Sequence, residues 1–168
     1  MKQLVGERSN LKFLAINATE NLNSRVLSNY FQPAKPVTVL CEGLLMYLSF
    51  QQKQQVLVNV REILQTYGGV WITSDFTTKE AGRMLQNDSA LQQVNQKIAS
   101  STGRRFADNE FDDLNHAKKF AQEQGFQVAE FSMLDVIDQL QSVSVLKINL
   151  DDLRGMLAVT PVFALTLA

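Results

Sequence analysis

Cysteine and histidine are almost missing from this chain of 168 residues, which contains only Cys41 and His116. A single cysteine cannot form an internal disulfide, and one cysteine with one histidine cannot supply the several ligands of a zinc site. Because His116 falls in a predicted helix far along the chain, we do not expect a nucleophilic Cys-His pair. Cys41 is instead predicted to be a small buried side chain, and His116 a surface residue.

The sequence also lacks an excess of either charge and any long apolar run. Sixteen Lys and Arg stand against seventeen Asp and Glu, which gives a formal net charge of −1, and the basic residues are dispersed. This pattern does not favour a nucleic-acid partner. No apolar run reaches the roughly 18 residues that a membrane-crossing helix needs, and no basic and apolar leader begins the chain. Together with the single cysteine, these features predict a cytoplasmic protein without a membrane partner.

The most informative stretch is the apolar run at residues 37–40, which is followed by Cys41, Glu42 and Gly43. A short, uniformly apolar run rich in valine predicts a strand covered on both faces. Gly43 permits a turn or a close approach of the backbone. Since ligands of open α/β sheets collect outside the carboxyl ends of the strands, Glu42 is a candidate ligand-binding carboxylate. Capping of the turn at residues 44–48 is its alternative role.

A helix and a second strand follow this run. Ser49 and Gln52 have the spacing of a capping box, and apolar side chains then recur at helical spacing. Gly68 is placed to end the helix, and residues 69–75 are typical of a buried strand with an acidic end. The strand-helix-strand order predicts the βαβ unit of a parallel sheet.

Further segments continue the alternation of strands and helices. Strands are predicted at residues 11–16, 126–131 and 162–167, and helices at residues 22–31, 78–100, 132–140 and from a cap at Asp108 or Asn109 to Gly125. No linker or internal repeat is visible, so we expect a single domain over residues 1–168. The fold class is α/β, with a mostly parallel sheet, an antiparallel strand near the carboxyl terminus, and helices on both faces.

The string Cys-Glu-Gly-Leu-Leu-Met-Tyr-Leu at positions 41–48, with the helix and the strand ending in Ser74 and Asp75 that follow it, resembles the leucine carboxyl methyltransferase family and its bacterial O-methyltransferase relatives. The segment 103–126 also fits, and the similarity extends from about Leu11 to the end. The resemblance implies a class I, Rossmann-like methyltransferase that uses S-adenosylmethionine and no metal.

Two parts of the family pattern have no counterpart in the sequence. Members have a Gly-rich loop after the first strand, which wraps the methionine part of the cofactor, and an acidic residue after the second strand, which holds the ribose. Gly6 is the only glycine before Gly43, so no such loop precedes the matching region. The chain therefore corresponds to the family's layout from about the third strand onward. It is either the carboxyl-terminal part of a longer protein or a shortened member whose cofactor site is incomplete or completed by another chain.

The resemblance assigns cofactor contacts to two strand ends. Asn17 and Ala18 match the loop after the third strand, which lies beside the adenine. Glu42 and Gly43 match the end of the fourth strand, next to the sulfonium and the amino group. An anionic side chain there can accept from the ammonium group and favours the positive sulfonium. Asn17 has the alternative role of stabilising a turn.

Tyr47, Asp75 and Arg105 are candidates for contacts with the substrate, and no residue is assigned a catalytic role. The Arg105 guanidinium can hold a substrate carboxylate in bidentate fashion, and a carboxylate needs no strong base because it is already ionised at neutral pH. Each residue has a simpler alternative: Tyr47 as a core aromatic, Asp75 as a cap for the helix after it, and Arg105 as a solvated loop charge.

Two hypotheses follow. The first is S-adenosylmethionine-dependent O-methyl transfer to a small-molecule or peptide carboxylate or hydroxyl, by the chain alone or as a fragment. The second is a non-catalytic, truncated methyltransferase-like domain that acts as an interaction or assembly module. An uncovered edge strand invites pairing with another chain, so the second hypothesis predicts a homodimer joined at the sheet edge.

Overall fold

The computed structural model describes residues 10–22, 27–32, 35–86, 97, 100, 106–146 and 149–168. An α/β arrangement is confirmed. Its named elements are β1 (Val37–Cys41), the 3-10 helix η1 (Leu45–Tyr47), α3 (Phe50–Tyr67), β2 (Gly69–Thr73), α4 (Lys79–Gln86), η2 (Phe106–Asn109), α6 (Leu114–Glu123), β3 (Phe126–Phe131), η3 (Met133–Gln139), α7 (Gln141–Leu146), α8 (Leu150–Ala158) and β4 (Val162–Leu167).

The strands of the described chain form one sheet in the order β1-β2-β4-β3. β1 and β2 are parallel, whereas β4 runs antiparallel to both of its neighbours. The predicted antiparallel strand near the carboxyl terminus is therefore confirmed. The prediction of a mostly parallel sheet is wrong, because two of the three described strand pairs are antiparallel. β4 lies between β2 and β3 and is antiparallel to both. β1, β2 and β3 nevertheless run in the same direction.

The predicted βαβ unit is present as β1, α3 and β2. The capping box is confirmed, since the Ser49 side chain accepts from the backbone N–H of Gln52 and the Gln52 side chain accepts from the backbone N–H of Ser49. Gly68 ends α3 with a φ of 71°. A Cβ on Gly69 would lie 1.9 Å from the backbone oxygen of Val37, so the paired glycines allow β2 to start directly against β1.

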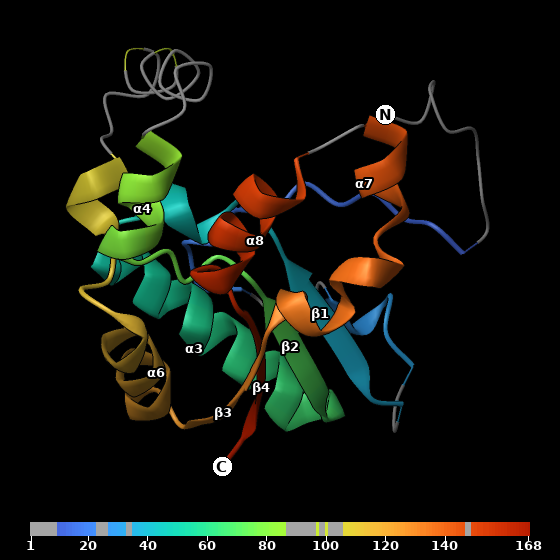
Figure 1. Ribbon diagram of the computed structural model, residues 1–168. Coiled ribbons are helices and arrows are strands. Elements are labelled where there is room, and N and C mark those ends of the chain that lie inside the picture. The colour runs from blue at the N-terminus through green and yellow to red at the C-terminus, as the bar shows by residue number, and fades with distance from the viewer. Residues whose placement is uncertain are drawn as a thin grey trace.

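The main core lies between one face of the sheet and the helices α3 and α6. Trp71, Phe163 and Leu165 point from the sheet into this layer and are each fully buried. Figure 1 shows α6 beside β3, in agreement with the close packing of these two elements. The buried apolar residues of this core are Leu45, Leu48, Val56, Leu57, Val60, Leu64, Trp71, Phe76, Phe111, Ala117, Ala121, Phe126, Phe163 and Leu165.

The opposite face of the sheet is covered less completely. A smaller apolar cluster joins Ile137 of η3 to Leu153 and Leu157 of α8. Figure 1 shows α8 near the ends at which β1 and β2 finish. Side chains alternate between the faces of a strand, so Leu40 of β1 points away from α3, and it is 74% exposed. The face of the sheet opposite α3 is therefore open to solvent at β1.

The strand predicted at residues 11–16 is wrong. These residues form no strand, and Leu11, Phe13, Leu14 and Ile16 are exposed. A single strand cannot satisfy its own backbone groups, and among the described residues the outer edge of β1 pairs with no neighbour. An apolar sequence alone therefore did not make this segment part of the sheet.

Several helix boundaries also differ from the expectations. α6 starts at Leu114 with Asp113 as its cap, in place of Asp108 or Asn109, because the Asp113 side chain accepts from the backbone N–H of His116. The segment at residues 133–139 is a 3-10 helix. Within residues 22–31, helix is described only at 27–28. In the predicted helix 78–100, residues 87–96, 98 and 99 lie outside the described chain.

Candidate functional site

The carboxyl ends of β1 and β2 lie beside a pocket of about 680 Å³. Three of the predicted site residues line this pocket: Glu42, Gly43 and Asp75. Met133 of η3 and Leu157 of α8 also line it. The full lining is Leu40, Cys41, Glu42, Gly43, Met46, Ile72, Thr73, Ser74, Asp75, Thr77, Met133, Leu157, Thr160 and Val162. The location is that expected for a ligand of an open α/β sheet.

Glu42 follows the last residue of β1 and has an exposed side chain at this pocket. Within the described parts of the chain, its carboxylate has no hydrogen-bond or ion-pair partner. The next residue, Gly43, has a φ of 67°, and a Cβ there would meet no atom within 4 Å. Glycine is therefore needed at position 43 for the backbone conformation, and the turn leaves the Glu42 carboxylate available to a ligand.

Asp75 lies at the same end of the sheet but is 5% exposed and bonded to protein. Its carboxylate accepts from the backbone N–H groups of Gly43 at 2.7 Å, Leu44 at 2.7 Å and Leu45 at 2.9 Å. Asp75, which follows β2, thus caps the start of η1, which follows β1. The sequence had instead suggested that Asp75 caps the helix after it or contacts the substrate. This role was not anticipated, because the capped residues come earlier in the chain and are brought near only by strand pairing.

Cys41 places its thiol at this pocket, with Sγ 3.6 Å from a carboxylate oxygen of Asp75. Burial raises the pKa of the Cys41 thiol to about 12, and the negative charge of Asp75 acts in the same direction. With this pKa the thiol stays protonated at neutral pH and lacks the features of a nucleophile. His116 lies on α6, where its ring stacks on Phe50 with ring centroids 5.8 Å apart.

Asn17 and Ala18 do not line this pocket. The Asn17 side-chain oxygen accepts from the backbone N–H of Thr19 at 3.1 Å and from the Thr19 hydroxyl at 2.8 Å, and the Asn17 side-chain NH2 donates to the Glu20 carboxylate at 2.7 Å. These bonds form a local turn, the alternative role that the sequence suggested. Ala18 packs against the main core, and its backbone oxygen accepts from Asn59 at 2.8 Å.

Tyr47 and Arg105 complete the predicted set. Tyr47 is part of η1, is half-buried, and does not line the pocket. Arg105 lies outside the described residues. The structure therefore brings together Glu42, Gly43 and Asp75, but it does not bring Asn17, Ala18 or Tyr47 to the same cavity.

Asn59 is an important residue that the sequence analysis missed. It is 2% exposed on α3, and its amide donates to the backbone oxygens of Ala18 at 2.8 Å and Glu20 at 2.7 Å. Its side-chain oxygen accepts from the backbone N–H of Leu22 at 3.2 Å. The available clue was its position beside the apolar stripe of α3. Asn59 attaches residues 18–22 to this helix.

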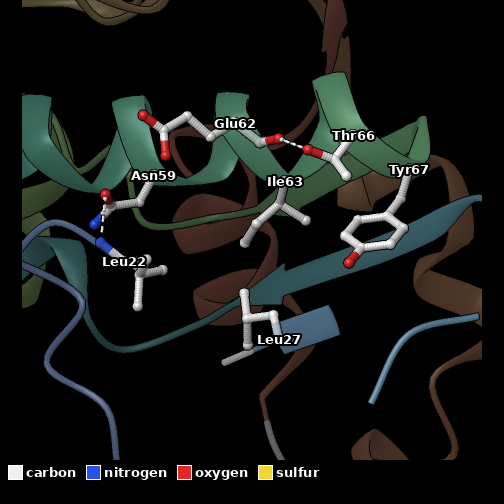
Figure 2. A pocket seen from close by; sticks show the side chains of 7 residues that line it. All are labelled: Leu22, Leu27, Asn59, Glu62, Ile63, Thr66 and Tyr67. Atoms are coloured by element: carbon white, nitrogen blue, oxygen red, sulfur yellow. Dashed lines mark hydrogen bonds between the residues drawn. The ribbon is translucent and has the colours of Figure 1, made fainter. Parts of the chain in front are cut away.

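Figure 2 shows a second, much smaller pocket beside this attachment. Leu22 and Leu27 face Ile63 and Tyr67 of α3 across it, and Asn59 lies at one end. Its volume is about 10 Å³, which is about the space of one water molecule. This pocket is a packing gap between the amino-terminal segment and α3, and it is too small for an organic ligand.

Lys53 is a second residue that the sequence analysis missed. It is fully buried on α3, with Nζ 4.8 Å from the ring centroids of both Phe50 and Phe111. The Nζ group donates to the backbone oxygen of Asn109. The clue in the sequence was that Lys53 precedes Val56 by three residues and so lies on the apolar side of the helix. The burial was not predicted, because the long side chain of a lysine usually extends its charged end into solvent.

Burial lowers the pKa of Lys53 to about 8, although the negative charges of Glu110 and Asp75 favour its cationic form. Burial also raises the pKa of Glu110, and the nearby Lys53 opposes that shift. The buried Lys53 cation thus interacts electrostatically with both acidic groups. It connects α3 to the segment that carries Asn109 and Glu110.

Residues 1–61 match the family model of leucine carboxyl methyltransferases. This match confirms the resemblance and contains Asn17, Ala18, Glu42, Gly43 and Tyr47, while the remainder of the chain lies outside it. No curated protein matches the chain.

The described residues contain no cluster of three or more His, Cys, Asp or Glu side chains arranged to hold a metal ion. They also contain no helix long and apolar enough to cross a membrane.

Proposed function

We propose that the chain is an S-adenosylmethionine-dependent O-methyltransferase, whole or as a fragment, with a Rossmann-like sheet, and that it acts on a carboxylate or hydroxyl of a small molecule or peptide. The observation that carries this proposal is the unpaired Glu42 carboxylate in a pocket of about 680 Å³ at the ends of β1 and β2. Glu42 also lies in the part of the chain that matches the methyltransferase family.

The pocket fits a cationic organic cofactor. Its volume is within the range of roughly 300–1,000 Å³ that small-molecule sites occupy. Leu40, Ile72 and Val162 give it an apolar wall, and Glu42 supplies the free negative charge. When bound, S-adenosylmethionine supplies a methyl group on a positively charged sulfur. In this proposal Glu42 accepts from the cofactor's ammonium group and favours its positive charge.

The fold agrees with this proposal in the direction of its strands. β1, β2 and β3 follow one another in the chain and run the same way, as in one half of a doubly wound sheet. In such an enzyme the protein acts mainly by positioning the reactants and excluding water. A carboxylate acceptor is already ionised at neutral pH, so this chemistry does not require a base from the chain. The single cysteine supports a cytoplasmic location as part of the same proposal.

The test is calorimetric titration of the folded chain with S-adenosylhomocysteine, the product form of the cofactor. We expect micromolar binding that weakens at least tenfold in Glu42→Gln, which keeps the side-chain shape but removes the charge. Glu62→Gln on the exposed side of α3 is the matched control and should bind as the wild type does. Absence of binding at millimolar product would reject the claim that this chain alone forms a cofactor site.

A second proposal is that the chain is an assembly module that pairs with a second copy through β1. It is favoured by the outer edge of β1, which has no partner strand in the described ranges, and by the exposed apolar residues Leu11, Phe13, Leu14, Ile16 and Leu40. Two such edges can pair around a twofold axis. Sedimentation equilibrium should then give a dimer that dissociates in Thr38→Lys, because a charge on the edge opposes pairing. A wild-type monomer at high concentration would reject this proposal.

A further inference from the structure

Three backbone N–H groups converge on the carboxylate of Asp75. Gly43 donates to one oxygen, and Leu44 and Leu45 both donate to the other, all within 2.9 Å. Hydrogen bonds to an ionised acceptor are stronger than those between neutral groups. The start of η1 has no cap from its own N-cap residue, Leu44, so Asp75 supplies the acceptor that this short helix lacks.

Asp75 is itself held in a fixed position. It is 5% exposed, and its backbone N–H donates to the hydroxyl oxygen of Thr73 at 3.1 Å. The buried Lys53 cation adds a favourable electrostatic interaction with Asp75. Both oxygens of the carboxylate are therefore engaged on the protein side, in a site that excludes most water.

The turn that Asp75 holds is also the turn that presents Glu42. Gly43 stands between the end of β1 and η1 with a φ of 67°, and its N–H donates to Asp75. Glu42 has no side-chain partner in the described residues, so the direction of its carboxylate depends on the backbone of residues 42 and 43. We therefore expect a change at Asp75 to alter the direction of Glu42 through the backbone of Gly43.

We propose that Asp75 is a positioning residue that holds the backbone of Gly43–Leu45 so that Glu42 faces the cofactor. This proposal rests on the proposed function, because it assumes that Glu42 binds the cofactor. It assigns the two carboxylates of the pocket different tasks: Glu42 contacts the ligand, and Asp75 sets the geometry of Glu42.

The first measurement needs no ligand. Amide hydrogen exchange followed by NMR should show protected N–H groups at Gly43, Leu44 and Leu45 in the wild type. Asp75→Asn has nearly the same shape but no charge, and we expect exchange at these amides to be at least tenfold faster while α3 stays protected. Unchanged exchange in Asp75→Asn would overturn the proposal.

The second measurement is a double-mutant cycle on the affinity for S-adenosylhomocysteine. Asp75→Asn alone should weaken binding at least tenfold, but only about twofold or less in the Glu42→Gln background, since the effect passes through Glu42. Asp113→Asn is the matched control, because Asp113 also caps a helix but lies at α6. Fully additive losses would overturn the positioning role and indicate a direct contact between Asp75 and the ligand.

Gly43→Ala provides a second route if Asp75→Asn does not fold. It strains the same turn through its positive φ, and the added Cβ has free space around it. It should weaken binding at least tenfold and speed exchange at Leu44 and Leu45, and normal values for both would overturn the proposal. A wild-type chain that fails to bind S-adenosylhomocysteine rejects the proposed function, whereas the exchange experiment still decides whether Asp75 holds the turn.

Discussion

The two faces of the sheet differ in how completely they are covered. On the face against α3 and α6, Trp71, Phe163 and Leu165 are fully buried. On the other face, Leu40 is 74% exposed and forms part of the pocket wall. The difference shows that the face against α3 and α6 holds most of the buried apolar side chains, while the other face and the strand ends stay open to a ligand.

The largest expected effect is on the packed face. Phe163→Ala should lower the free energy of unfolding by about 3–5 kcal/mol, because it empties a fully buried site whose ring lies 5.3 Å from that of Phe76. Urea denaturation followed by circular dichroism measures this change. A loss below about 1 kcal/mol would mean that this face is not the main core.

Loss of the hydrogen bonds that Asn59 makes to residues 18–22 should have the next largest effect on the free energy of unfolding. Asn59→Leu leaves the backbone groups of Ala18, Glu20 and Leu22 without their partner, and we expect a loss of about 1–3 kcal/mol in the same denaturation assay. Gln65→Leu, at an exposed position of α3, is the control and should change the free energy of unfolding by about 0.5 kcal/mol or less. Equal effects of the two substitutions would remove the special role of Asn59.

The pH dependence of stability tests the buried cation of the packed face. The pKa of Lys53 is about 8 in the folded chain and 10.5 as its ordinary value, so the unfolded chain binds more protons between these pH values. Stability should therefore rise by about 1 kcal/mol from pH 7 to pH 9. The pKa of Cys41 is raised from 9.0 to about 12, so its opposite contribution begins near pH 8 and stays below about 0.5 kcal/mol up to pH 9.

Lys53→Met separates this contribution from all others. The variant should lose the rise between pH 7 and pH 9, because methionine fills the same space without a titrating group. Thermal unfolding at several pH values provides the measurement. A wild-type curve that is flat over this range would show that Lys53 keeps an ordinary pKa.

The smallest expected effect is on the open face. Leu40→Thr introduces a β-branched residue, which suits a strand, and removes little buried surface, so we expect a change of about 0.5 kcal/mol or less in the free energy of unfolding. A loss as large as that of Phe163→Ala would contradict the difference between the two faces.

Local patterns predicted the part of the fold that positions Glu42. The capping box at Ser49 and Gln52, the glycine pair after α3 and the apolar run before Glu42 each act through neighbours in the sequence, and all are present. The open carboxylate at the end of β1 followed from the same reasoning. These features are readable because short-range geometry and side-chain periodicity set them.

The insertion of β4 and the roles of Asp75 and Lys53 were decided only by the tertiary structure. β4 lies between β2 and β3 although it is last in the chain, and Asp75 caps residues that precede it by about 30 positions. The apolar segment 11–16 stayed outside the sheet for the same kind of reason. Strand pairing and long-range hydrogen bonds depend on which partners the folded chain brings together. The sequence by itself determined the βαβ unit and the carboxylate at its end, whereas the neighbours of each strand and the groups that fix the turn followed from packing.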